Sequence, residues 1–328
     1  MYYIMKKIDL RDRKILYALD VDARQSFAKI GKMAGVTKSA VSYRIQRLEE
    51  EGIIKGYYTF IDGIRLGYIV LRLYIIFQYT TNDLEKEIVA YFKAHGNVVT
   101  VYSLHGRYDL EVIFWIKNIN NFYSFWQQTL YRYGDYFQDQ ILSFYIKYIT
   151  YKSSYLQNDN RNPGHAKLTD IMGGQKPIVL DPIDYTILKS LASQARTPLT
   201  QIAEQLGMSS DTINYHIRKL IQAGVIQSFR ANIDYAKIGY QYFKADIYLK
   251  DYSARNKIIA YVTLDPHLIS INETTGSSHL ELEFHLPSLS HLHNLMNEIN
   301  TTFPNAMRNY KYFNFQHIHK YIFLPDEK

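Results

Sequence analysis

The hydrophobic residues of the N-terminal segment recur at the three- and four-residue spacings of amphipathic helices. Asp9 can cap a first helix, and Gly35 ends a second. A third helix is predicted over residues 37–50, with Gly52 where helices commonly stop. The apolar positions of these helices are Ile15, Leu16, Leu19, Phe27, Ile30, Met33, Val41, Ile45 and Leu48. Residues 52–62 then alternate as in a short β ribbon, and three helices followed by a ribbon predict a winged helix-turn-helix.

After the ribbon the pattern changes to strand, helix, strand, strand, helix, strand. These elements are predicted at about residues 68–79, 83–94, 97–104, 109–117, 119–132 and 139–150. The βαββαβ order is typical of a ferredoxin-like domain, in which two helices back an antiparallel sheet. The expected fold class is therefore α+β.

The whole arrangement occurs twice in the 328-residue chain. A shift that carries Asp9 onto Asp181 matches the two halves without a gap over about sixty residues, which indicates a tandem duplication. GVTKSAVSYRIQRLEEEGII at 35–54 is followed by GMSSDTINYHIRKLIQAGVI at 207–226. In the second copy Thr197 is expected to cap a helix whose first turn holds Pro198.

The duplication predicts four domains and one connection. Winged helix-turn-helix domains are expected at 1–62 and 178–234, and ferredoxin-like domains at 63–151 and 235–328. The connection, 152–177, is polar, rich in Gly and Asn and without periodicity, which predicts a linker. The second ferredoxin-like domain repeats the element order at about 240–249, 253–262, 267–274, 279–286, 288–301 and 308–323.

Composition narrows the class of protein. A hydrophobic fraction of 47% is that of a globular chain, and the absence of cysteine excludes disulfides and thiolate chemistry. The N-terminus lacks the apolar region of a secretion signal, and the apolar run at 69–77 contains Arg72 and is too short to span a membrane. We therefore expect a soluble cytoplasmic protein without membrane contact. A net charge of +7 is compatible with a nucleic-acid partner.

Together these features resemble the Lrp/AsnC (feast/famine) family of prokaryotic transcription regulators. The resemblance is carried by DLRDRKILYALDVDAR at 9–24, RIQRLEEEGII at 44–54 and IDGIRLGY at 61–68. LHGRYDLEV at 104–112 is similar to the Gly-x-x-Asp turn of the family's effector-sensing domain. The resemblance implies a regulator that binds specific double-stranded DNA, is not an enzyme and needs no cofactor. Because family members usually pair as dimers, it also implies that the fused copies pair as an internal pseudo-dimer, with further association between chains left open.

The outward face of the third helix is the expected DNA-reading surface. Ser and Gln side chains can reach base edges in the major groove, and Lys and Arg can bind phosphates. The predicted contacts are Lys38, Ser39, Ser42, Tyr43, Arg44, Gln46 and Arg47, and in the second copy Ser209, Ser210, Asn214, Tyr215, Arg218 and Lys219. The alternative is a polar helix face that is merely solvated.

The two copies differ in charge at this surface. Residues 26–48 contain five basic side chains and no acid, whereas 198–220 contain Arg218 and Lys219 against Glu204 and Asp211. Each phosphate that a basic group neutralises adds salt-sensitive affinity. The first copy is therefore predicted to be the main DNA anchor, and the second a weaker or partner-facing copy.

The turn from Gly106 to Asp109 is the candidate effector site, by resemblance to the family alone. With Tyr108, and with Gly276 and Ser278 in the second copy, it is predicted to bind a small effector such as an amino acid. The second copy departs from the family pattern, because His279 stands where the first has Asp109. The alternative is a tight turn in which Gly supplies conformational freedom and Asp a local hydrogen bond.

Histidine is concentrated in the second half, where His317 and His319 share a face of one predicted strand. Imidazole is a common metal ligand, but two residues do not complete a coordination shell, and no spacing matches a zinc site. No metal site and no catalytic residue are predicted.

Two other functions remain open at this point. Siroheme decarboxylases look like the same modules, also in fused pairs, but would require a His-Asn-Tyr-type segment that NVVTVYSLHGRYDLEV and HLISINETTGSSHLEL do not supply. An interaction-only protein that keeps the fold without binding DNA is the other alternative.

Overall fold

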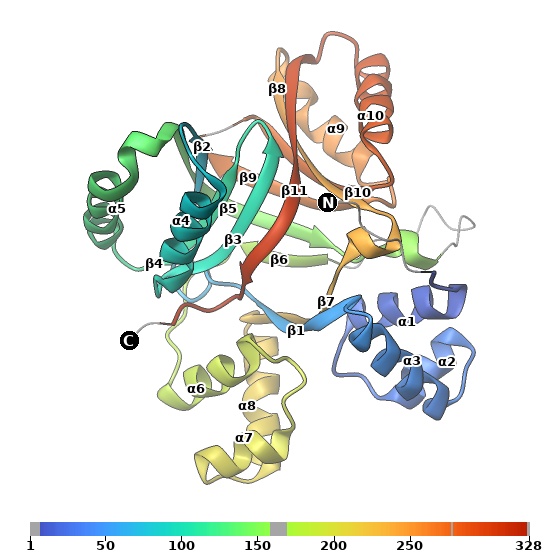
Figure 1. The fold of residues 1–328 in the computed structure, drawn as a ribbon. Coiled ribbons are helices and arrows are strands. Elements are labelled where there is room, and N and C mark those ends of the chain that lie inside the picture. Colours follow the sequence, from blue (N-terminus) through green and yellow to red (C-terminus); the bar gives the residue numbers. More distant parts are fainter. Residues whose placement is uncertain (1–6, 158–168, 277, 327–328) are drawn as a thin grey trace.

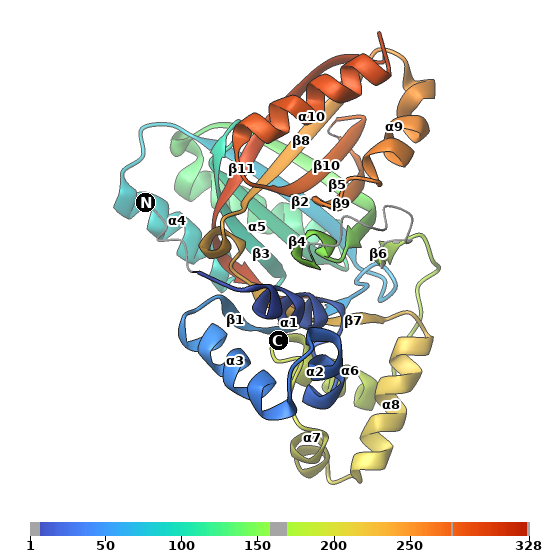
Figure 2. The same cartoon turned by 90° about the vertical axis from the view of Figure 1, so that its right-hand side faces the viewer.

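The computed structural model describes residues 7–157, 169–276 and 278–326. Figures 1 and 2 show two small helical domains on one side of a larger body made of strands and helices. We call the helical domains the first head and the second head, because each begins one copy of the repeat. The body contains the βαββαβ units of both copies.

Each head contains the three predicted helices. Those of the first are α1 (Leu10–Val21), α2 (Phe27–Ala34) and α3 (Lys38–Glu50), and those of the second are α6 (Pro182–Ala192), α7 (Leu199–Leu206) and α8 (Ser210–Gln222). Asp9 caps α1 by accepting the Asp12 N–H, as predicted, and Gly35 ends α2 with φ of 70°. The predicted cap of α7 is wrong: Pro198 itself holds the N-cap position, while the Thr197 hydroxyl donates to the Gln194 carbonyl.

The ribbon predicted within each head is a single strand that pairs with the other copy. β1 (Ile54–Ile61) and β7 (Ile226–Ile233) form a separate two-stranded antiparallel sheet. In each head the loop after the first helix also binds the other copy: the Ala23 N–H donates to the Phe229 carbonyl, and the Ala195 N–H donates to the Tyr57 carbonyl. The alternation identified a strand correctly, but alternation does not say which strand is its partner.

The body follows the predicted order in both copies. The first unit is β2 (Ile69–Phe77), α4 (Asn82–Ala94), β3 (Val98–Gly106), β4 (Leu110–Ile116), α5 (Ile119–Tyr133) and β5 (Phe137–Tyr151). The second is β8 (Gln241–Leu249), α9 (Arg255–Val262), β9 (Leu268–Thr275), β10 (Leu280–Leu286), α10 (Leu289–Thr302) and β11 (Met307–Tyr321). Short 3-10 helices lie at Gly134–Tyr136, Ser154–Gln157, Tyr235–Ile238 and Tyr252–Ala254.

The two units share one sheet that closes on itself. Its strand order is β2-β4-β3-β11-β8-β10-β9-β5, and β5 also pairs with β2. The long strands β5 and β11 make the closure, because each begins beside a strand of its own copy and ends beside a strand of the other. The ferredoxin-like units are therefore paired within a single chain, which leaves few free edges in the sheet.

The segment predicted as a linker contains ordered structure. Within 152–177, Thr169–Gly173 forms β6, which pairs antiparallel with Lys147–Tyr151 of β5. A five-residue strand in polar surroundings gives little periodicity, so the sequence did not reveal it. The linker prediction therefore fails for β6, and residues 158–168 lie outside the described residues.

Candidate nucleic-acid interface

Helix α3 turns a polar face to solvent. Val41, Ile45 and Leu48 are buried in the core of the head, as the spacing predicted. On the opposite side Lys38, Ser39, Ser42, Tyr43 and Gln46 are exposed, and together with Phe27 they border a shallow surface hollow. Tyr43 is 69% exposed, although an aromatic ring of that size usually finds a partner. These five predicted DNA contacts are therefore brought together on one accessible face.

Arg44 and Arg47 lie elsewhere on the same helix and bind the first helix of the head. The Arg44 guanidinium is 2.9 Å from an Asp9 carboxylate oxygen and 2.7 Å from one of Asp12, and Arg47 is 2.6 Å from Asp12. The Asp12 side chain is only 1% exposed, so it depends on these cations for compensation. The two arginines therefore hold α3 to α1 instead of projecting freely toward phosphates.

The second head repeats this arrangement with other residues. His216 Nδ1 lies 2.7 Å from Asp184, and Lys219 Nζ lies 2.8 Å from Asp184 and 3.0 Å from Asp181. The Asp184 backbone N–H and the Lys219 ammonium bind the Asp181 carboxylate and lower its pKa to about 2. Donor atoms of Asp181, Asp184 and His216 lie within 4.8 Å of one another, as in some metal sites. Because Lys219 already binds both carboxylates, we interpret the group as the counterpart of the arginine–aspartate pairs in the first head.

The other predicted contacts of the second head have mixed surroundings. Tyr215 is 66% exposed and Arg218 is also exposed, whereas Ser210 and Asn214 are half-buried. The Ser209 hydroxyl caps α8 by accepting the Thr212 N–H. Ser209, Tyr215 and Arg218 are therefore the accessible part of this set, although the Ser209 hydroxyl is engaged as a cap.

The charge difference between the heads persists once the internal ion pairs are set aside. Lys29, Lys32 and Lys38 are exposed in the first head, and no ion pair joins them to any described residue. In the second head the comparable group is Arg218, because Lys219 is held in ion pairs, and α7 and α8 also expose the acids Glu204 and Asp211.

The predicted effector turn of the first copy is held against strand β2. The Asp109 carboxylate accepts the Phe77 N–H at 2.7 Å, and the Tyr108 ring stacks on Tyr74 at 4.2 Å. Burial raises the pKa of Tyr108, whose hydroxyl has no hydrogen-bond partner among the described residues. Gly106 has φ of 120°, and a Cβ there would lie 3.3 Å from the backbone of Phe313. A structural role accounts for both Gly106 and Asp109, although the Asp109 hydrogen bond reaches β2 and is not the local bond expected. Effector binding at this turn stays a prediction.

In the corresponding turn of the second copy, a different side chain makes the same backbone hydrogen bond. His279 Nδ1 accepts the Leu249 N–H at 2.9 Å, which is the bond that Asp109 makes to Phe77 in the first copy. Gly276 has φ of 91°, and the Ser278 hydroxyl donates to the Leu280 carbonyl at 3.3 Å. The exchange of Asp for His thus keeps a backbone hydrogen bond at the end of a strand.

The two histidines considered as metal ligands touch each other. The rings of His317 and His319 are 4.5 Å apart, and His319 Nε2 lies 2.8 Å from the Ser103 hydroxyl. Burial and the neighbouring His317 lower the pKa of His319 to about 4.

A buried network of charged side chains between the two body units was not predicted. Arg72 Nη2 lies 2.8 Å from Glu281 Oε1, and Lys244 Nζ lies 2.7 Å from Glu281 Oε2. Burial opposes ionisation of Glu281, but these two cations outweigh it and hold its pKa well below the usual range. Burial raises the pKa of Glu111 to about 7, and one of its oxygens has no hydrogen bond among the described residues. The network joins the two copies through charges in the interior.

Comparison with known proteins agrees with the duplicated architecture. The family described as winged helix-turn-helix DNA-binding matches residues 8–55 and 180–227. The HTH-type transcriptional regulator Ptr1 of Methanocaldococcus jannaschii is 32% identical over 124 residues, which cover 38% of this chain and 82% of that protein. The regulatory protein AsnC of Haemophilus influenzae is 34% identical over 106 residues, 32% of this chain and 70% of that protein.

A solved structure covers nearly the whole chain. The siroheme decarboxylase NirDL aligns with a TM-score of 0.60 over 96% of this chain and 94% of its own, at 14% sequence identity. That similarity shows a shared fold. None of the helices in the described ranges combines the length and apolarity needed to cross a bilayer.

Proposed function

Because the chain belongs to the Lrp/AsnC family of transcription regulators and carries its modules twice, we propose that it binds specific sequences of double-stranded DNA through its two heads. The observation that carries the proposal is the exposed face of α3. Lys38, Ser42 and Gln46 offer a cation and polar groups at spacings suited to a major groove, and no described residue covers them.

The heads act as a fixed pair in this proposal. β1 and β7 join them, and Arg24 of the first head donates to the Ala195 and Thr197 carbonyls of the second at 2.6 and 3.0 Å. One chain thus presents two recognition helices, as a dimer of single-copy regulators does. We propose that the fused chain works as such a pseudo-dimer, with further association between chains as an addition.

The first head supplies most of the DNA affinity in this account. Lys29, Lys32 and Lys38 are exposed and can bind phosphates, whereas the second head offers Arg218 and also exposes the acids Glu204 and Asp211. Because counterion release scales with the phosphates neutralised, the heads should contribute unequally.

A small effector bound at Gly106, Tyr108 and Asp109 would regulate this binding. The turn packs against β11, so a ligand there would contact the junction between the two copies. Gly276 and Ser278 form the corresponding turn of the second copy.

A salt-titrated gel shift against genomic fragments tests the function. We expect specific complexes whose affinity falls steeply as salt rises. Absence of any such complex, together with tetrapyrrole absorbance of the purified protein, would contradict the proposal and favour the decarboxylase alternative.

A further inference from the structure

The duplication makes the two long strands β5 and β11 directly comparable. β5 pairs with β9 on one edge, and on the other with β2 and then with β6 at Lys147–Tyr151. β11 pairs with β3 on one edge and with β8 on the other, but the pairing with β8 stops at Phe315. In the described part of the chain no strand pairs with 317–321 on that edge. This segment, the free edge of β11, corresponds to the part of β5 that β6 covers.

Two side chains hold the backbone of β6 on its outer side. The Ile171 N–H donates to Gln227 Oε1 at 3.1 Å, and the Gly173 N–H donates to Asp62 Oδ2 at 3.0 Å. Because these alternate N–H groups point outward, those of Asp170 and Met172 face β5. The strand is thus fixed from both sides.

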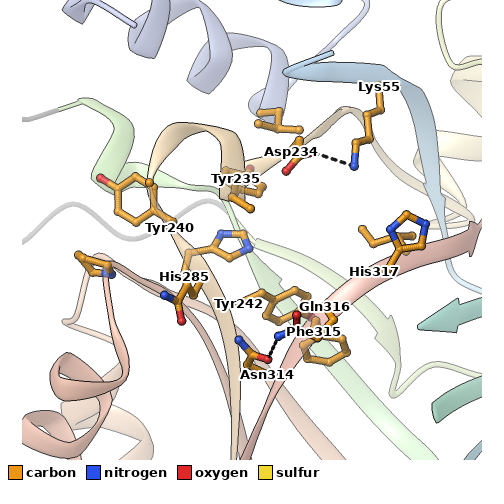
Figure 3. A pocket seen from close by; sticks show the side chains of 16 residues that line it. Lys55, Asp234, Tyr235, Tyr240, Tyr242, His285, Asn314, Phe315, Gln316 and His317 are labelled. Carbon is orange, nitrogen blue, oxygen red and sulfur yellow. Dashed lines mark hydrogen bonds and ion pairs between the residues drawn. The ribbon is translucent and has the colours of Figure 1, made fainter. Parts of the chain in front are cut away.

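The same two positions of the repeat line a pocket beside the free edge of β11. Lys55 corresponds to Gln227 and Asp234 to Asp62, and without a strand between them they form an ion pair of 2.8 Å. The pocket has a volume of about 430 Å³ and is bordered by the backbone from Asn314 to Ile318. Figure 3 shows Lys55 and Asp234 on one side of it and Asn314, Gln316 and His317 on the other.

Several of the other residues that line the pocket are aromatic. The Tyr242 and Phe315 rings stack at 3.9 Å, and Tyr240 and His285 also line the pocket. In the first copy the Met172 side chain of β6 is buried against a comparable aromatic group that includes Tyr145 and Tyr148. An apolar side chain on a bound strand would find similar surroundings here.

We propose that the free edge of β11 binds an extended segment of a separate polypeptide, which adds to the sheet as β6 adds to β5. The N–H groups of the bound segment would donate to Asp234. A carbonyl or terminal carboxylate of the segment would accept from Lys55, because the Lys55 ammonium can only donate, whereas Gln227 at the corresponding position accepts through its amide oxygen. If two copies of this edge paired with each other, the Lys55 and His317 side chains of both would come together, and Asp234 of each copy would be the only acid in the pocket lining. A separate peptide that brings a carboxylate therefore fits the charges better. The described residues after β11 do not cover the edge, because they continue on the side of β3, where the Ile322 N–H donates to the Val99 carbonyl and the Asp326 N–H to the Gly96 carbonyl.

Synthetic peptides test this proposal without reference to DNA binding, so either proposal can fail alone. The probe is fluorescein-labelled Thr-Asp-Ile-Met-Gly, the sequence of β6, measured by fluorescence polarisation on the full chain. We expect saturable binding that weakens at least about tenfold when the Asp and Met amides are N-methylated, because those groups face the sheet edge. Binding that is absent, or equal for the methylated peptide, would overturn the proposal.

A pair of variants locates the binding. Lys55→Ala should weaken the unmodified peptide about tenfold, because it removes a charged donor, whereas Lys29→Ala, an exposed lysine of the same head, should leave binding unchanged. Equal effects of the two variants would overturn the assignment. A concentration-dependent dimer that Lys55→Ala abolishes would overturn it in favour of a second copy as the occupant. Should Lys55→Ala not fold, the methylated peptide still decides the question on the unmodified chain.

Discussion

Single buried carboxylates explain much of how the first head is built. Asp12 is 1% exposed and accepts hydrogen bonds from Arg44 and Arg47 of α3, while its backbone N–H donates to the Asp9 cap. A buried carboxylate without such partners would be costly, so the charges of Arg44 and Arg47 have a structural role in the head. A count of basic residues therefore overstates the charge available to a nucleic acid.

Replacing Arg44 with alanine should destabilise the head by about 2 kcal/mol, because Asp12 would keep only Arg47 as a partner. Lys38→Ala, on the exposed face of the same helix, should change stability by less than about 0.5 kcal/mol. Urea unfolding of the two variants measures the difference. Identical midpoints would show that the Asp12 pairs contribute no stability.

Glu111 predicts a pH dependence of stability. Burial raises its pKa to about 7, so the folded chain holds this proton more tightly than the unfolded chain, in which a glutamate has its ordinary lower pKa. The stability that the protonated Glu111 contributes is fully present below the pKa that Glu111 has in the unfolded chain, and it is lost as the pH rises toward 7. Glu111→Gln should therefore stabilise the protein by about 2 kcal/mol at pH 8 and change little at pH 4. Denaturant melts at both pH values check this, and an equal effect at each would contradict the buried, protonated carboxyl.

At the scale of elements, periodicity predicted the strands of the body closely. The strand expected at 139–150 is β5, Phe137–Tyr151, and the one expected at 68–79 is β2, Ile69–Phe77. Partners were harder to predict than elements, because alternation fixes which face of a strand is buried and not which strand lies beside it. The pairing of β1 with β7 and that of β6 with β5 are two partnerships that the sequence pattern did not reveal.

The site residues show the same limit. Helical spacing correctly separated the buried stripe of α3 from Lys38, Ser42 and Gln46, which are exposed. It could not show that Arg44 reaches Asp12 on another helix. Arg72 lies in an apolar run typical of a strand, and its partner Glu281 belongs to the other copy, so local pattern carried no signal of their contact.

Strand β6 can be tested through a pair of neighbouring glycines. Gly173 and Gly174 both have positive φ, but a Cβ at Gly173 would lie 2.4 Å from the Ile146 carbonyl oxygen, whereas one at Gly174 meets nothing closer than 4.0 Å. Gly174→Ala should cost about 1 kcal/mol of backbone strain. Gly173→Ala should cost about 2–3 kcal/mol and increase amide exchange along β6. Equal costs in denaturant melts would contradict the close packing of β6 on β5.

At the scale of the whole molecule, the duplication joins two heads and two body units through reciprocal contacts. Arg24 of the first head lies over the Phe229 ring, and Arg196 of the second lies over the Tyr57 ring. Each contact pairs one copy's head with the other copy's ribbon strand, so neither head is complete without the other. These contacts between the two copies do not involve the exposed faces of the heads, and those faces differ in charge.

The slope of DNA affinity against salt, measured for Lys38→Ala and Arg218→Ala beside the unmodified chain, tests this account most directly. We predict that Lys38→Ala weakens binding more than Arg218→Ala and reduces the salt slope by about one counterion, because it removes a phosphate contact from the main anchor. Equal losses from the two variants would contradict the unequal heads. An unmodified chain whose DNA binding does not change with salt would contradict the proposed function itself.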